Sequence, residues 1–159
     1  MTTPTPTPVT ALARRWRLEV NMGNATTPDW QLCPAITEFQ WTAEPNVEDS
    51  STYDDDGWAG NTKTGQAFEV TATFNRKTSA DSTVYHPVHE KLRAVAFGWG
   101  DESEVGVRWM DRNGLPEAYQ GSVLVQWAPS GGAATDLDQV EVTLTGNGPL
   151  AQIDNPLAA

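Results

Sequence analysis

The stretch EPNVEDSSTYDDDGWAGNTKTGQAFEVTATFNRK, residues 44–77, contains both the clearest strand pattern of the chain and its longest polar connection. Apolar and polar side chains alternate over 66–77, which predicts a half-buried β-strand. The apolar members of this alternation are Phe68, Val70, Ala72 and Phe74. Residues 44–64 show neither a strand period nor a helix period, so we expect them to form a long acidic loop.

We expect this loop to act as an interaction arm. A connection of this length in a small domain is usually functional or disordered, and Tyr53 and Trp58 are the only large rings in it. The residues expected to form its docking tip are Tyr53, Asp54, Asp55, Asp56 and Trp58. The Asp-Asp-Asp-Gly run is also typical of a calcium loop, but an EF-hand ends with a Glu near position twelve, where this chain has Gly65. We therefore expect no metal site.

The rest of the chain is predicted to be mainly β. Alternating apolar residues predict further strands, at 14–22, 36–42, 105–110, 119–127 and 140–145. Residues 86–97 are predicted as the one helix, because Pro87 suits a first helical position and apolar residues recur at helical spacing. Asn113-Gly114 predicts a hairpin turn with positive φ angles. The fold expected is an antiparallel β-sandwich or barrel-like domain with one flanking α-helix.

Three parts are expected along the chain. Residues 1–12 begin with alternating Thr and Pro, which favours a flexible or polyproline-like N-terminal tail. Residues 13–148 form the β-sandwich domain, with the arm at 44–65 and the helix at 86–97. Residues 149–159 form a C-terminal tail.

Composition restricts the possible partners. The formal net charge is −11 at a sequence pI near 4.4, which argues against a protein that grips nucleic acid through its phosphates. Cys33 is the only cysteine and is expected to be a packing residue. No apolar stretch has the length of a signal peptide core or of a membrane span, so no membrane insertion is expected.

No catalytic signature is found. The sequence lacks a phosphate-binding Gly-rich loop with Lys, a Ser nucleophile elbow and a Cys/His set at zinc spacing. His86 and His89 lie three residues apart, but without a third ligand nearby the interpretation as surface or capping histidines is favoured. Paired carboxylates for acid and base catalysis stay open, although no pattern selects any two of them. We therefore expect no enzyme and no cofactor.

The chain resembles the major tail tube proteins of long-tailed bacteriophages of the siphophage type, in particular those of phages with actinobacterial hosts. The resemblance covers nearly the whole chain. It rests on RWRLEVN at 15–21, ED followed by YDDDGW within 48–58, the strand from TG to FNRK at 64–77, YHPVHEKLR at 85–93, and GNGP at 146–149. His86 departs slightly from the pattern, since an Asp would be a more ordinary helix cap.

This resemblance implies a structural protein of the virion tail, assembled in the host cytoplasm. Six copies would form a ring, and stacked rings would form a hollow tube through which double-stranded DNA passes without specific binding. Loops and terminal segments would bridge copies and rings, and the tape-measure and tail-tip or terminator proteins would be further partners. The arm and the Thr/Pro tail match the bridging segments by position and character.

If a sheet lines such a tube, its strands should show a polar, acidic or neutral row opposite an apolar one. Two strands fit best, and their lumen-facing candidates are Glu69, Thr71 and Thr73, and Glu141, Thr143 and Thr145. We expect Glu69 and Glu141 to repel passing DNA. The strands at 15–21 and 105–110 fit less well because their arginines would hold phosphate.

A carbohydrate-binding β-sandwich is the alternative from another class. Seven Trp is a high number for this length, and exposed rings stack on sugars. Four of them fall in predicted strands where core residues are expected, namely Trp16, Trp41, Trp109 and Trp127. Trp30, Trp58 and Trp99 would remain to build a sugar-binding platform.

Overall fold

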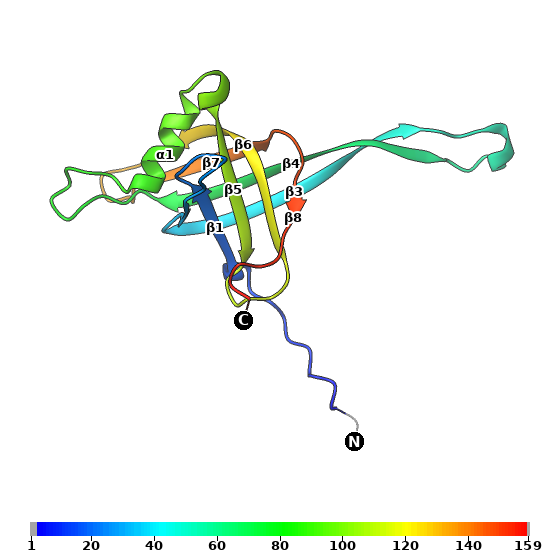
Figure 1. Ribbon diagram of the computed structural model, residues 1–159, viewed down its shortest axis with the longest axis horizontal. Helices are drawn as coiled ribbons and strands as arrows, with labels where there is room; N and C mark the ends of the chain where they lie inside the picture. Colours follow the sequence, from blue (N-terminus) through cyan, green and yellow to red (C-terminus); the bar gives the residue numbers. More distant parts are fainter. Residues whose placement is uncertain (1–2, 159) are drawn as a thin grey trace.

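A computed structural model of the chain describes residues 3–158, and this part of the chain contains eight strands and one α-helix (Figure 1). The strands are β1 (Trp16–Asn21), β2 (Trp30–Leu32), β3 (Ile36–Asp49), β4 (Asn61–Asn75), β5 (Glu104–Asp111), β6 (Ala118–Pro129), β7 (Gln139–Gly146) and β8 (Ala151–Gln152). The helix is α1 (Pro87–Ala96), and three short 3-10 helices are η1 (Ala13–Arg15), η2 (Tyr53–Asp55) and η3 (Gly100–Ser103). The expected mainly β fold with one helix is confirmed.

The strands form one antiparallel sheet that folds over itself. Their order is β2-β1-β5-β6-β7-β4-β3, and β8 pairs with β6 beside this path. Strands β1 and β5 cross β3 and β4 at a steep angle (Figure 1). The ring of Trp16 on β1 lies 6.0 Å from Phe39 and 6.2 Å from Trp41 on β3, so the two ends of the sheet face each other. The result is a sandwich-like domain with an aromatic contact between its layers.

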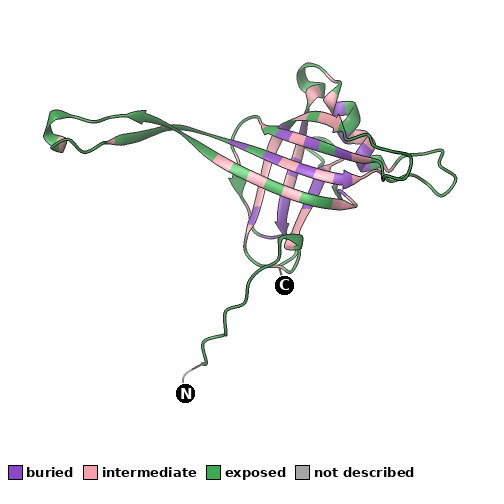
Figure 2. Cartoon of the chain, turned by 180° about the vertical axis from the view of Figure 1, so that it is seen from behind, coloured by how far each residue is buried: buried purple, intermediate pink, exposed green. Residues whose placement is uncertain are grey.

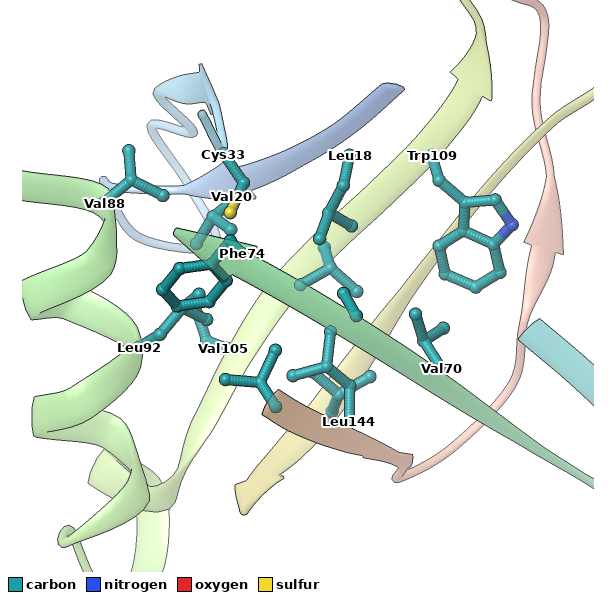
Figure 3. Packing of buried hydrophobic residues seen from close by; sticks show 14 of the residues in the cluster. Leu18, Val20, Cys33, Val70, Phe74, Val88, Leu92, Val105, Trp109 and Leu144 are labelled. Carbon is teal, nitrogen blue, oxygen red and sulfur yellow. The ribbon is translucent and has the colours of Figure 1, made fainter. Parts of the chain in front are cut away.

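The core lies between these layers (Figure 3). Its strand residues come from the alternations in the sequence and include Leu18, Val20, Val70, Phe74, Val107, Trp109, Val123, Val142 and Leu144. Helix α1 adds Val88, Leu92 and Val95, which recur at helical spacing on its one apolar side. Cys33 is buried in the same cluster, and burial raises the pKa of its thiol to about 12. It is a packing residue, as expected.

Helix α1 begins and ends within one residue of the predicted bounds. His86 caps it, because its Nδ1 accepts a hydrogen bond from the Val88 amide at 3.2 Å. His89 is fully buried instead, and its ring stacks on Phe74 at 4.0 Å between centroids. Its Nδ1 accepts from the Lys77 amide, so its Nε2 donates to the Pro34 carbonyl oxygen at 3.1 Å. The interpretation as surface or capping histidines is right for His86 and wrong for His89.

The connection between β5 and β6 is longer than the tight turn expected from Asn113-Gly114. It runs over residues 112–117, and of these two residues only Gly114 has a positive φ angle, of 85°. The Asp111 carboxylate accepts the Asn113 amide at 2.7 Å, which holds the turn from its first residue.

The arm is a β-hairpin, and the expectation of loop over 44–64 is wrong. Strands β3 and β4 pair out to Asp49 and Asn61, with a register shift between Asn46 and Val47, which leaves only residues 50–60 as the connection (Figure 1). The hairpin projects far from the body and its outer part is exposed on both sides (Figure 2). A period of two appears in a sequence only where one face is buried, so these strands carry no alternation.

The two terminal segments differ. Residues 3–12 are exposed and contain neither helix nor strand (Figure 2). Residues 149–158 include β8 and the buried Asn155, so part of the segment assigned to a C-terminal tail packs on the domain. Residues 1, 2 and 159 of the two predicted tails lie outside the described part. No helix within residues 3–158 has both the length and the apolar character needed to cross a membrane.

Candidate functional site

The tip of the arm is ordered by its own hydrogen bonds. The Asp55 carboxylate accepts the Thr52 amide at 2.7 Å in a capping box at the start of η2. The Trp58 amide then donates to the Asp55 carbonyl at 3.0 Å, and the Ser50 amide donates to the Gly60 carbonyl at 2.9 Å. These bonds close the connection of the hairpin without any help from the body of the domain.

All five residues predicted for the docking tip lie together in this connection, at 53–58. Tyr53 is fully exposed and Trp58 is 80 % exposed. Asp54 and Asp56 are exposed beside them, while Asp55 is engaged in the capping box. An ordered segment that holds two aromatic rings in water is typical of an interaction site, because burying such rings on a partner is favourable.

The six lumen-facing candidates also lie together, on one face of the sheet. Side chains of directly paired residues in neighbouring strands project from the same face. The pairing of β3, β4, β7 and β6 gives three rows: Glu38, Thr73, Glu141 and Ala128; Gln40, Thr71, Thr143 and Gln126; and Thr42, Glu69, Thr145 and Leu124. We call these three rows the acidic face.

The acidic face has three carboxylates and neither Lys nor Arg in its rows, so its electrostatic potential is negative. It faces away from the core, because the alternate residues Val70, Ala72 and Val142 are buried. Sequence reasoning found the β4 and β7 members and missed those on β3 and β6. The missing information was the strand order, since only pairing places Glu38 in one row with Glu141.

The outward side of β1 and β5 has a different character. Arg108 forms a bidentate pair with Glu19, with Nε and Nη2 at 3.1 and 3.3 Å from the two carboxylate oxygens. Glu19 is buried, and the Arg108 guanidinium also covers the Trp30 ring at 4.7 Å. The charge of Arg108 on β5 is thus neutralised by Glu19. The carboxylates of the acidic face, in contrast, have no cation in their rows.

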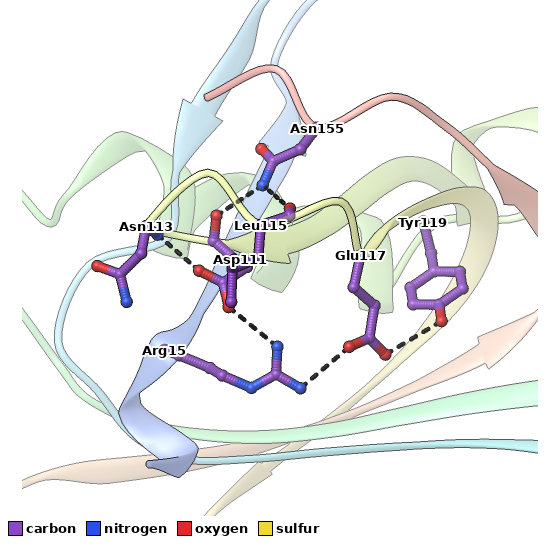
Figure 4. A network of polar contacts seen from close by, with 7 residues as sticks. All are labelled: Arg15, Asp111, Asn113, Leu115, Glu117, Tyr119 and Asn155. Carbon is purple, nitrogen blue, oxygen red and sulfur yellow. Dashed lines mark hydrogen bonds and ion pairs between the residues drawn. The ribbon is translucent and has the colours of Figure 1, made fainter. Parts of the chain in front are cut away.

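A third polar cluster lies at the base of the domain, where η1, the β5–β6 connection and the C-terminal segment come together (Figure 4). Arg15 donates to Asp111 and to Glu117, each at 3.0 Å, and Tyr119 donates to Glu117 at 3.1 Å. Asn155 donates to the carbonyls of Asp111 and Leu115. The cluster ties the start of β1, the β5–β6 connection and the C-terminal segment into one unit.

Of the three tryptophans proposed for a sugar platform, Trp58 lies apart from the other two. Trp58 is at the arm tip, and Trp99 directly precedes η3 at the far end of α1, well away from the arm (Figure 1). Trp30 is half-buried under Arg108. Trp58 therefore builds no common platform with the other two rings. Residues 3–158 also contain no group of three His, Cys, Asp or Glu side chains placed to hold a metal ion.

No protein-family model matches the sequence, and no curated protein matches it. Solved structures do match the fold. A chain from the tail of an empty gene transfer agent (GTA) particle with C6 symmetry superposes with a TM-score of 0.68 at 11 % identity, covering 91 % of this chain and 99 % of that one. The chain has the tail tube fold.

Two further structures agree. A chain of the virion of a native gene transfer agent superposes with a TM-score of 0.67 at 10 % identity, over 89 % of this chain and 98 % of that one. The SPP1 tail tube protein superposes with a TM-score of 0.62 at 14 % identity, over 92 % of this chain and 81 % of that one. Coverage of this extent means that the tail tube fold includes nearly the whole chain, beyond the sandwich core alone.

Proposed function

We propose that this chain is the structural subunit of a phage tail tube, of the siphophage type and from a phage with an actinobacterial host. Copies of it form rings, most simply of six, and stacked rings form the hollow conduit for genome ejection. The observation that carries the proposal is the superposition on a chain of the C6-symmetric gene transfer agent tail over nearly the full length of both chains. The role is structural rather than enzymatic and uses no cofactor.

The acidic face supports a position on the inner wall of the tube. Double-stranded DNA has one negative charge per about 1.7 Å of its axis, so a wall with lysines or arginines would hold it by releasing counterions. Glu38, Glu69 and Glu141 have the opposite effect and keep DNA from adhering. The face is polar and includes the three longest strands, β3, β4 and β6, and β3 at its edge leaves one row of backbone groups free for a neighbouring copy.

The arm and the N-terminal tail are proposed to make the contacts between copies. Both project from the body, and both are exposed in the single chain (Figure 2). Further partners of the same assembly are the tape-measure protein and the tail-tip or terminator proteins. The chain is then a component of the virion tail, assembled in the host cytoplasm, with double-stranded DNA passing through the lumen and no membrane insertion.

Negative-stain microscopy and sedimentation of the purified protein test this function. The protein should form hollow rings or tubes, either alone or when the tape-measure and tail-tip proteins are co-expressed. A protein that stays monomeric in both preparations at high concentration would overturn the proposal.

A further inference from the structure

The base of the domain has a surface that the tube fold does not explain. The segments that carry the polar cluster of Figure 4, namely residues 12–15, the β5–β6 connection and the C-terminal segment, also contain exposed apolar and basic residues. We define the base patch as Leu12, Arg14, Arg112, Leu115 and Leu157. The three leucines are between 40 and 56 % exposed. Backbone contacts hold these segments side by side, because the Arg112 amide donates to the Arg15 carbonyl at 2.8 Å.

The charge of this patch is unusual in an acidic chain. Arg14 and Arg112 are both exposed, and within residues 3–158 neither has a carboxylate at ion-pair distance. Arg15, between them in the cluster, is already neutralised by Asp111 and Glu117. Two uncompensated guanidinium groups beside exposed leucines favour a partner that brings carboxylates and apolar rings together.

We propose that the base patch receives the arm tip of a second copy of this chain. This inference rests on the proposed function and names the surface on which the arm docks. The tip presents exposed Tyr53 and Trp58 together with the carboxylates of Asp54 and Asp56, which are free of side-chain hydrogen bonds among the described residues. The two aromatic rings of the tip would pack against the leucines of the base patch, and its two carboxylates would pair with the arginines. The two surfaces are therefore complementary in apolar character and in charge.

The arm cannot reach the base of its own chain. Strand β4 loses its β7 partner at Glu69, so residues 61–68 extend the hairpin by roughly 25 Å beyond the sheet, at about 3.3 Å per residue. The arm and the base point in different directions (Figure 1). The contact must therefore join two copies, and because it joins two different surfaces, repetition of it from copy to copy generates rings or open stacks.

The rival receiving surface is the end of the domain near α1, where Lys77 and Lys91 have no ion-pair partner within residues 3–158. That end carries its own exposed acids, Asp81, Asp101 and Glu102, close to these lysines along the chain. The acids at that end outnumber its lysines, whereas the three segments of the base contain one exposed acid, Asp154, against Arg14 and Arg112. The base is for this reason the better complement for the acidic tip.

Site-directed cross-linking of full-length protein tests the contact directly. Ala59→Cys places a thiol at the exposed arm tip, and Asn113→Cys places one beside the base patch. The native Cys33 is buried, and its raised pKa of about 12 keeps it unreactive. A mixture of the two variants treated with a short bismaleimide should give cross-linked dimers. Ala59→Cys mixed with Ala80→Cys, an exposed position near Lys77, is the matched control and should give none.

Charge exchange provides the second measurement. Asp54→Lys with Asp56→Lys reverses the arm, and Arg14→Glu with Arg112→Glu reverses the base patch; Asp55 is left intact because it caps η2. Each variant alone should need an about tenfold or higher concentration to assemble, because like charges facing across an interface cost several kcal/mol. A one-to-one mixture should restore assembly, since each arm then meets a base of opposite charge.

The outcomes separate the two proposals. Tubes without the cross-link between positions 59 and 113, or a base-reversed variant that assembles normally, would overturn the docking assignment and leave the tube function intact. A cross-link between 59 and 80 would move the receiving surface to the end near α1 and would also overturn the assignment. The predicted cross-link in a protein that never forms rings or tubes would contradict the proposed function while supporting the contact.

Discussion

Phe68 packs its ring directly against Gly146, so that a Cβ added to this glycine would lie 2.5 Å from Cδ1 and Cε1 of the ring. Gly121 leaves the same kind of space, with its ideal Cβ position 2.7 Å from Cζ. Phe68 is the last buried residue of β4 before the arm, since residues 61–67 are all exposed. Two glycines thus make room for the ring that anchors the root of the arm.

Gly146→Ala should destabilise the domain by about 1–3 kcal/mol, the usual cost of overpacking a core. Urea denaturation followed by tryptophan fluorescence measures it. Gly65→Ala is the matched control, because its Cβ would lie 3.7 Å from the Asn46 Cβ in ordinary contact. The control should be neutral or slightly stabilising, as a strand glycine costs chain entropy. Equal stability of the two variants would mean that Phe68 has other space to occupy.

His89 should make the stability depend on pH between about 6.5 and 4. Burial lowers the pKa of this histidine from 6.5 to about 4, so in this window the unfolded chain binds a proton that the folded chain does not. The contribution of His89 is complete above pH 6.5 and is lost as the pH falls to 4, an effect on the order of 3 kcal/mol. Denaturant midpoints measured across this range test it.

Two variants isolate this histidine. His89→Phe keeps the stacking on Phe74 but cannot take a proton, so it should be less stable at neutral pH and should lose the slope between pH 6.5 and 4. His86→Asn keeps a side chain that caps α1 and should retain the slope. A slope that survives in His89→Phe would assign the titration to other groups.

Trp58→Ala should leave the monomer folded and hinder assembly by about 2 kcal/mol, because exposed aromatic anchors dominate interfaces once they are buried. The critical concentration for tube formation, measured by sedimentation, is the readout. Trp99→Ala removes an equally exposed ring outside the arm and should assemble like the unmodified protein. If both variants form tubes of normal length and stability, the arm is not an anchor.

The N-terminal tail should be cleaved in the free protein and, if it is protected at all, only in the assembled one. Residues 3–12 are exposed and make no strand or helix, and Pro4, Pro6 and Pro8 cannot donate to a sheet. Limited proteolysis with mass spectrometry before and after tube formation measures the protection. Resistance of the tail in the monomer would contradict this prediction.

Sequence reasoning reached the core because every core strand has one buried face. The alternations of Leu18 with Val20 and of Val140 with Val142 are visible in the sequence and are buried in the structure. The outer arm has no buried face, so its strands have no such signal and were expected as loop. In the outer arm, hydrogen bonds between β3 and β4 hold both strands extended. This pairing cannot be predicted from the sequence of either strand alone.

The sequence predicted the arm tip but only part of the acidic face and none of the base patch, because these surfaces depend on which segments lie side by side. Residues adjacent along the chain, such as Tyr53 and Trp58, were found because one connection carries both. The acidic face needs the order β3-β4-β7-β6, and the base patch needs the C-terminal segment to pack beside the β5–β6 connection. His89 was placed outside the core because a polar side chain carries no burial signal until its partner, the Pro34 carbonyl, is known.

Replacing Glu69 and Glu141 with Lys should leave tubes able to assemble and should slow genome ejection. Both side chains are exposed on the acidic face, so the change costs no packing but places cations where DNA passes. The slowing should be strongest at low salt, since the Debye length is about 8 Å at physiological ionic strength and longer below it. Asp101→Lys with Glu102→Lys changes the net charge equally in an exposed segment off this face and should have no effect.

A cryo-EM reconstruction of the assembled protein tests the central claim most directly, because it shows both the architecture and the direction of the acidic face. We predict a hollow tube of stacked rings in which β3, β4, β7 and β6 line the channel and Glu69 and Glu141 point into it. A reconstruction in which these two side chains lie on the outer surface, or one without a continuous channel, would contradict the account.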